Sequence, residues 1–292
     1  MRFDWSTLDR PPPTGLVGAR KLAHHAVQWA TKAARANLKA TPDDSHSSLD
    51  WDAGHAALLS QPLPAGPSTG GPGNDAVRVG LRIAGLELIV VRGGEVLDLL
   101  PLDGIEDATA GSWTDSTLHG FGLLPASKAR LPYVISDHAV ASGAPYEIGP
   151  EARALEELSR WYDGAADALG AVAARLAGLR PGPGPVRCWP HHFDIATLVA
   201  LDEGHAETSR SIGIGVSPGD EYYAQPYAYI SPWPNLDAAN LPGLPPPGHW
   251  HTRGFVAAVA TGEEILALGE RGRGLLAFIA GAVEIGRARL KA

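Results

Sequence analysis

The strongest constraint on the fold is the sequence PGPGP at residues 181–185. Each proline fixes its own φ angle and lacks an amide proton, so neither an α-helix nor a central β-strand can pass through this run. The run follows the clearest helical pattern in the chain, at residues 150–179, which opens with Pro150 and Glu151. We therefore predict that this helix opens the C-terminal half and that it ends before the PGPGP run.

Similar signals divide the rest of the chain. Three prolines at residues 11–13 favour an extended arm over residues 1–15. Apolar residues recur at helical spacing over residues 16–38 and predict an amphipathic helix, whereas the glycine, proline and serine of residues 60–76 predict a loop. Apolar residues at period two over residues 77–91 predict a hairpin or a bent pair of strands.

These patterns predict an α+β protein in which helices cover one or more antiparallel sheets. We expect an N-terminal arm (1–15), an N-terminal half (16–149) and a C-terminal half (150–292), packed together as one globular unit. Both halves read as a helix, then a turn with aspartate and histidine, then several strands, which leaves a loose internal repeat open. Hydrophobic residues make up 45% of the 292 residues, enough to build a core.

Composition excludes several classes of protein. The chain has 24 basic and 32 acidic side chains and a net charge of −8, so it lacks the basic surface that nucleic acid or an anionic membrane requires. Cys188 is the only cysteine, which excludes a disulfide framework and an iron–sulfur cluster. No window is apolar enough for a membrane span, and residues 1–20 lack an apolar signal region. We expect a cytoplasmic protein, and the sequence leaves its oligomeric state open.

The densest group of chemically active side chains is the segment WPHHFD at residues 189–194. If the segment is extended, His192 and Asp194 point to one face and His191 to the other, because side chains alternate along a strand. His192 and Asp194 are therefore candidate metal ligands, and His191 is a candidate pocket residue. The alternative is structural: the aromatic residues fill the core while the polar side chains hydrogen-bond to one another and to nearby backbone.

A second pair of histidines, His249 and His251 in the segment GHWHTR, shares a strand face in the same way. With His192 and Asp194 they would form a site that leaves positions open on a divalent ion, and zinc or iron is the cofactor that suits such ligands. The sequence leaves open whether a metal binds. In a variant without metal, Asp194 would orient a histidine that acts as a general base.

Further candidates lie in the turn SPGDEYY, in the strand that follows it and near the start of the chain. Asp220 and Glu221 are candidate catalytic acids, and Arg253 is the third candidate catalytic residue. The candidate ligand-pocket residues are His46, His191, Tyr223, Tyr227 and Trp250. Asp43 and Asp44 could add polar groups to the same cleft as His46. Each of these segments also has a structural interpretation, as a turn or as alternating core and surface residues.

Two resemblances bear on these segments. WPHHFD, the later SPGD turn and the PYAY sequence at residues 226–229 resemble a bacterial family that has no assigned function and is marked by a WPHHFD segment and an SPGD turn. That likeness covers residues 186–234 and implies no activity. The pattern of His192, Asp194 and a distant histidine also looks like the iron-ligand motif of 2-oxoglutarate-dependent dioxygenases, although Arg253 follows its histidine more closely than in that family.

The sequence thus supports two functional hypotheses. The first is a metal-dependent enzyme that acts on a small organic molecule in a cleft formed by WPHHFD, SPGDEYY and GHWHTR. The second is a non-catalytic protein that binds a small molecule and uses its histidines structurally. A scaffold without a site is a third possibility, and no nucleotide-binding fingerprint or nucleophile elbow occurs in the sequence.

Overall fold

The computed structural model describes residues 2–10, 12–13, 15–64, 76–204 and 209–291. The chain forms two compact units, each assembled from separate stretches of sequence. The N-terminal unit consists of Thr14–Ser159 and Cys188–Phe193. The C-terminal unit consists of Met1–Pro13, Arg160–Arg187 and Asp194–Ala292.

The N-terminal unit contains an antiparallel meander. Its strands pair in chain order and are β1 (Leu49–Asp52), β2 (Ala57–Ser60), β3 (Val77–Arg82), β4 (Glu87–Arg92) and β5 (Glu95–Pro101). The pairing of β3 with β4 confirms the hairpin predicted over residues 77–91. The strand β7 (Arg187–Trp189) pairs with β1 through Leu49 and Cys188, so a segment distant in sequence extends this meander.

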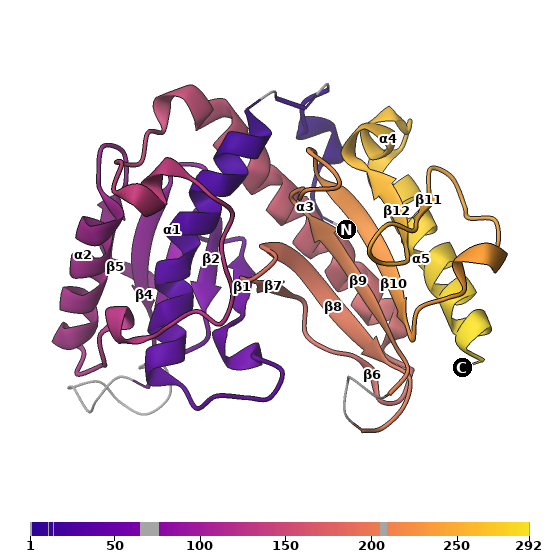
Figure 1. Cartoon of the computed structure of the whole chain (residues 1–292), viewed down its shortest axis with the longest axis horizontal. Helices are drawn as coiled ribbons and strands as arrows, with labels where there is room; N and C mark the ends of the chain where they lie inside the picture. Colours follow the sequence, from indigo (N-terminus) through magenta and orange to yellow (C-terminus); the bar gives the residue numbers. More distant parts are fainter. Residues whose placement is uncertain (1, 11, 14, 65–75, 205–208, 292) are drawn as a thin grey trace. The chain divides into compact units, whose positions relative to one another are not determined.

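Helix α1 (Leu16–Asn37) packs against β2 and β3, and it confirms the amphipathic helix predicted over residues 16–38 (Figure 1). Helix α2 (Asp107–Gly120) packs against α1 and β5. The two helices approach closely at Gly111, where a Cβ atom would lie 2.4 Å from the Trp29 ring. The indole of Trp29 also donates a hydrogen bond to Asp107 at 2.8 Å, which fixes the two helices to each other.

The C-terminal unit contains a second antiparallel array. Its neighbouring strands, in spatial order, are β8 (Asp194–Ala200), β9 (Ser211–Ser217), β10 (Tyr227–Trp233), β12 (Ala257–Thr261) and β11 (His249–His251). The short strand β6 (Gly182–Pro183), from the PGPGP run, pairs with β8. Helix α4 (Gly262–Ala267) follows β12, and helix α5 (Arg271–Leu290) packs on β9 and β10 (Figure 1).

Helix α3 (Ala152–Leu176) contributes to both units, because Ser159 belongs to the N-terminal unit and Arg160 to the C-terminal unit. Within the C-terminal unit the N-terminal arm packs on this helix. The ring of Trp5 meets that of Trp161 edge-on with centroids 6.0 Å apart. The amides of Arg2 and Phe3 donate to the Asp167 carboxylate at 2.6 and 3.0 Å, so the arm is anchored at its start.

The α+β class is confirmed, and each unit follows the same order of long helix, antiparallel strands and further helix. The bounds of the units differ from those expected from sequence. The division falls between Ser159 and Arg160, within α3, rather than at residue 150. Cys188–Phe193 joins the N-terminal unit, where Cys188 pairs with Leu49.

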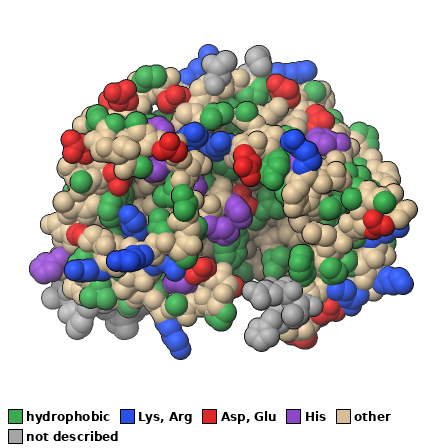
Figure 2. Space-filling view, viewed as in Figure 1, with side chains coloured by type: hydrophobic (Ala, Val, Ile, Leu, Met, Phe, Trp, Pro, Cys, Tyr) green, Lys and Arg blue, Asp and Glu red, His purple; other side chains and the backbone are tan. Residues whose placement is uncertain are grey.

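None of the described helices combines the length and the apolar character needed to cross a bilayer. The surface side chains agree with the sequence composition. On the face drawn in Figure 2, acidic and basic side chains are mixed, without a broad patch of one sign.

Candidate functional site

The WPHHFD segment is a turn followed by a strand. After β7 ends at Trp189, the amides of His192 and Phe193 both donate to the Trp189 carbonyl, at 3.1 and 2.7 Å. Phe193 adopts the left-handed conformation, with φ of 55°, and β8 begins only at Asp194. The strand alternation that suggested a shared face for His192 and Asp194 therefore does not apply. His192 is exposed in the N-terminal unit, whereas Asp194 is buried in the C-terminal unit.

The left-handed residue is stabilised by what its side chain contacts. Phe193 is fully buried and stacks on the ring of His24 from α1, with centroids 5.1 Å apart and planes 3° apart. The Pro190 carbonyl accepts a hydrogen bond from His24 Nε2 at 2.7 Å and another from Gln28 Nε2 at 3.1 Å. Burial lowers the pKa of His24 to about 4, so the ring is neutral near pH 7 and donates through Nε2. These contacts hold the WPHHF turn (residues 189–193) against α1.

A cavity of about 390 Å³ opens beside this turn in the N-terminal unit. Its lining includes the rings of Tyr133, Trp189 and His191, together with Asp43, Asp44 and Ser47. The structure thus brings His191 and the two aspartates to one cavity. His46 is buried next to Ser47 in the chain, and its Nδ1 accepts from the Thr41 amide at 3.3 Å rather than lining the space.

In the C-terminal unit three predicted residues meet directly. The hydroxyl of Tyr223 lies 3.2 Å from Nε2 of His249 and 3.1 Å from Nδ1 of His251. The two histidines share a face of β11, as the strand period predicts, and Trp250 between them directs its indole to the Pro242 carbonyl at 2.7 Å. We call Tyr223, His249 and His251 the His–Tyr cluster.

In each histidine, the ring nitrogen that does not face Tyr223 lies near another acceptor. Nε2 of His251 lies 2.6 Å from the Arg253 carbonyl, which can only accept, so Nδ1 presents a lone pair to Tyr223. Nδ1 of His249 lies 3.4 Å from the Glu264 carboxylate, while Nε2 of the same ring faces Tyr223. Two ring nitrogens thus face one hydroxyl, and its single proton can serve only one of them.

Tyr223 keeps that proton at neutral pH. Burial raises the pKa of its phenol, and the nearby carboxylates of Glu264 and Asp220 raise it further. The ring also contacts Tyr227, with centroids 4.8 Å apart, and Tyr227 contacts Tyr229 at 6.2 Å. An aromatic row therefore leads away from the cluster along β10.

Asp220 positions the aromatic residues of the SPGD turn. Its Oδ1 accepts from the amides of Tyr222 and Tyr223 at 2.8 and 2.9 Å, and its Oδ2 accepts from the Tyr227 hydroxyl at 2.6 Å. Burial and this bond to Asp220 raise the pKa of Tyr227. Both oxygens of the Asp220 carboxylate therefore already accept hydrogen bonds that hold the turn carrying Tyr223. Glu221 is exposed beside it.

Arg253 and Asp194 both belong to the C-terminal unit, but one is exposed and the other is buried. Arg253 is exposed, and its guanidinium carbon lies 5.7 Å from the centre of the Tyr222 ring. Asp194 is buried and accepts a short hydrogen bond from the Tyr229 hydroxyl. Asp194 therefore supports the aromatic row, and Arg253 is the exposed cation near the cluster.

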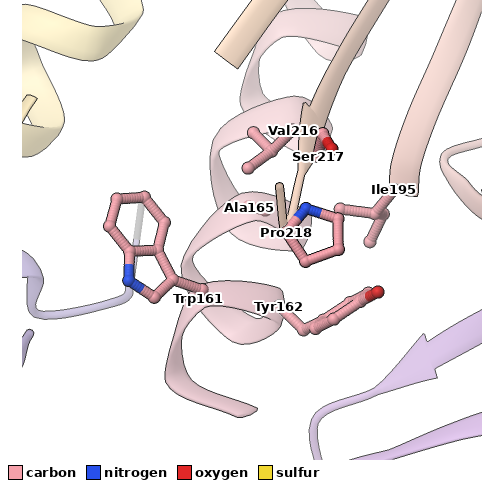
Figure 3. Close-up of a pocket in the computed structure, with 7 residues that line it drawn as sticks. All are labelled: Trp161, Tyr162, Ala165, Ile195, Val216, Ser217 and Pro218. Atoms are coloured by element: carbon pink, nitrogen blue, oxygen red, sulfur yellow. The ribbon is translucent and has the colours of Figure 1, made fainter. Parts of the chain in front are cut away.

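A second, much smaller cavity lies behind the SPGD turn. Figure 3 shows it between Trp161, Tyr162 and Ala165 of α3 and the ends of β8 and β9, at Ile195, Val216, Ser217 and Pro218. Its volume of about 10 Å³ is room for about one water molecule. This space can hold solvent but not an organic ligand.

Three side chains that organise these sites were not identified from the sequence patterns. Glu264 holds His249, and it is also the third residue of a helix capping box with Thr261, a signal readable as T-x-x-E. His24 and Gln28 hold the WPHHF turn, and their i, i+4 spacing predicts only that they share a helix face.

Among the described residues, no group of three or more histidine, cysteine, aspartate or glutamate side chains is arranged to hold a metal ion. Of the four predicted metal ligands, the structure places His249 and His251 together. The chain matches no known protein family, no curated protein and no solved structure. The site must therefore be interpreted from its own geometry.

Proposed function

We propose that the protein is a metal-dependent enzyme that acts on a small organic molecule at the His–Tyr cluster. The observation that carries this proposal is that two imidazole nitrogens face one phenol oxygen, at 3.2 and 3.1 Å. Donor atoms bound at about 2 Å around a tetrahedral ion lie about 3.3 Å from one another. The two nitrogen–oxygen distances in the cluster are close to that value, which supports these three atoms as the ligands of one ion.

The residues around the cluster also suit a metal. Ligating histidines usually donate their second ring nitrogen to a carboxylate or a backbone carbonyl, and here Glu264 and the Arg253 carbonyl take these roles. Two imidazoles favour zinc or iron over magnesium or calcium. Such an ion would hold a water molecule or polarise a substrate oxygen at its open positions.

The surroundings indicate the kind of substrate. His251 stacks on Phe255 with centroids 4.3 Å apart, and Tyr222 meets the His251 ring at 4.9 Å, so the cluster has aromatic walls. The exposed Arg253 is the cation beside them and can bind a carboxylate. We therefore expect a small organic acid, with Arg253 orienting it against the aromatic rings.

The test is a metal titration of the full chain after chelation, with Zn²⁺ in air and Fe²⁺ under anaerobic conditions. We expect one equivalent to bind, and we expect His249→Ala and His251→Ala each to weaken binding by at least about 100-fold. His192→Ala and His119→Ala are matched controls, because both histidines are exposed and lie in the N-terminal unit. Absence of stoichiometric binding, or equal losses in the controls, would overturn the proposal.

The second candidate is a non-catalytic small-molecule-binding protein in which the histidines are structural. One observation favours it: His251 is buried, and both of its ring nitrogens already face partners, the Tyr223 hydroxyl and the Arg253 carbonyl. In this case neither the wild type nor His251→Ala binds a metal, and His251→Ala only lowers the melting temperature. The same titration, combined with thermal unfolding, therefore separates the two functions.

The setting of this activity is also part of the proposal. We place it in the cytoplasm, supported by the one cysteine, Cys188, which is buried and leaves the chain without an internal disulfide, as suits a reducing compartment. A net charge of −8 supports a small molecule rather than a nucleic acid as the partner.

A further inference from the structure

We infer that the cavity beside the WPHHF turn is a binding site for an organic cation, a compact molecule with an ammonium group. This site lies wholly in the N-terminal unit and is independent of the His–Tyr cluster. Its volume of about 390 Å³ falls within the range of small-ligand pockets, roughly 300–1,000 Å³.

The first argument is the charge of the lining. Asp43 and Asp44 both border the cavity, and none of its described lining residues is a lysine or an arginine. Arg35 pairs with Asp44 at 2.9 Å and offsets one of the two negative charges. Desolvation, and then the neighbouring His192, lower the pKa of His191 to about 4, so this ring adds no positive charge near pH 7. Arg35 also donates to Ser47 of the lining at 3.2 Å, so one net negative charge remains at the cavity and favours a cation over an anion.

The second argument is the aromatic character of the rest of the lining. The rings of Trp189 and Tyr133 both lie near that of His191, with centroids 6.3 and 5.9 Å from it. An ammonium group is attracted to the faces of such rings, and the attraction is strongest for tryptophan. A neutral ligand could pack on the rings but would make no ion pair with the aspartates. An organic cation can interact with both the rings and the aspartates.

The third argument is that the site is already shaped. The Tyr133 hydroxyl donates to Gln28 Oε1 at 2.7 Å, and the same Gln28 side chain donates to the Pro190 carbonyl at 3.1 Å. Asp44 is held in the left-handed conformation with φ of 54°, which is uncommon for a residue other than glycine. Tyr133, Pro190 and the backbone of Asp44 are thus held in place before a ligand arrives, which reduces the entropy lost on binding.

The test uses three probes that share a phenyl ring: benzyltrimethylammonium, benzyl alcohol and benzoate. Calorimetric titration in the presence of a chelator should show binding of the cation, at least about tenfold weaker binding of the alcohol, and no binding of benzoate. The chelator removes any metal, so this result is independent of the outcome at the His–Tyr cluster. Preference for benzoate, or equal affinity for all three probes, would overturn the inference.

Variants locate the binding within the cavity. Asp43→Asn and Asp44→Asn preserve shape and should each weaken cation binding by about three- to tenfold, with no effect on benzyl alcohol. Trp189→Leu should weaken it by about tenfold or more. Glu95→Gln makes the same change in net charge at an exposed position of β5 and should leave the affinity within about twofold. Asp43 and Asp44 are exposed, so their variants should fold normally, and unchanged cation affinity in both would contradict the inference.

Discussion

In the N-terminal unit, aromatic and acidic side chains border an open cavity of about 390 Å³, whereas in the C-terminal unit the His–Tyr cluster is closed by direct contacts among its own side chains. The two units have the same order of helix, strands and helix. The difference arises from the segments that carry the polar groups. In one unit these are the loop after α1 and the WPHHF turn, and in the other they are the SPGDEYY turn and the strand β11. The comparison teaches that one element order can provide both a ligand cavity and a set of converging donor atoms.

The largest expected effect tests how far the WPHHF turn supports the N-terminal unit. Phe193→Ala should lower the free energy of unfolding by about 3–5 kcal/mol, because it empties a fully buried site against His24. Denaturant unfolding followed by circular dichroism measures this loss. Val134→Ala, at a side chain that is 94% exposed, is the control and should change stability by less than about 0.5 kcal/mol. A loss below about 1 kcal/mol for Phe193→Ala would show that the turn is not part of the core.

The next effect tests the aromatic row of the C-terminal unit. Tyr229→Phe removes the hydroxyl that donates to the buried Asp194 carboxylate, so the unfolding free energy should fall by about 2 kcal/mol. Asp194→Asn keeps an oxygen for the phenol and should cost less. If Tyr229→Phe is as stable as the wild type in urea unfolding, the bond does not stabilise the unit.

A smaller effect tests whether Glu264 supports His249 as a metal ligand. Glu264→Gln retains an acceptor for the capping box at Thr261 but removes the charge that faces His249. We expect zinc affinity to fall by about tenfold while the melting temperature changes little. Glu263→Gln is the matched control, since Glu263 is exposed in the same helical turn. A fall in melting temperature without a fall in affinity would assign Glu264 to the helix cap alone.

The last effect builds up gradually with pH and concerns His24. Its pKa is about 4 in the folded chain and near 6.5 when unfolded, so the unfolded state binds a proton first as the pH falls. Stability should be independent of this group above pH 6.5 and should decrease towards pH 4, by about 1 kcal/mol per pH unit. Other groups titrate in the same window, so the measurement is the difference between wild type and His24→Gln. Identical pH profiles would refute the shifted pKa.

Local patterns were sufficient to predict the elements that depend on local spacing. The apolar period of residues 16–38 predicted α1, and the strand period placed His249 and His251 on one face of β11. Pairing of β3 with β4 followed from the alternation over residues 77–91. In each case the side-chain period and the backbone geometry are set within a few residues.

The WPHHF turn could not be predicted in this way. The left-handed angle of Phe193 depends on its contact with His24, a residue far away in the sequence. The role of Asp220 has a similar origin. Its bonds to the amides of Tyr222 and Tyr223 are local, but the bond to Tyr227 requires the β9–β10 hairpin to be formed. Long-range contacts of this kind leave no periodic signal in a single sequence.

The interleaved order of the two units has a consequence for the moment at which each can fold on the ribosome. The N-terminal unit includes Cys188–Phe193, so its last stacking partner for His24 emerges only after about two-thirds of the chain has been synthesised. The first thirteen residues, in turn, must wait for α3 before Trp5 can reach Trp161. Neither unit can be completed before the other has begun, and the nascent chain must carry two unfinished cores at once.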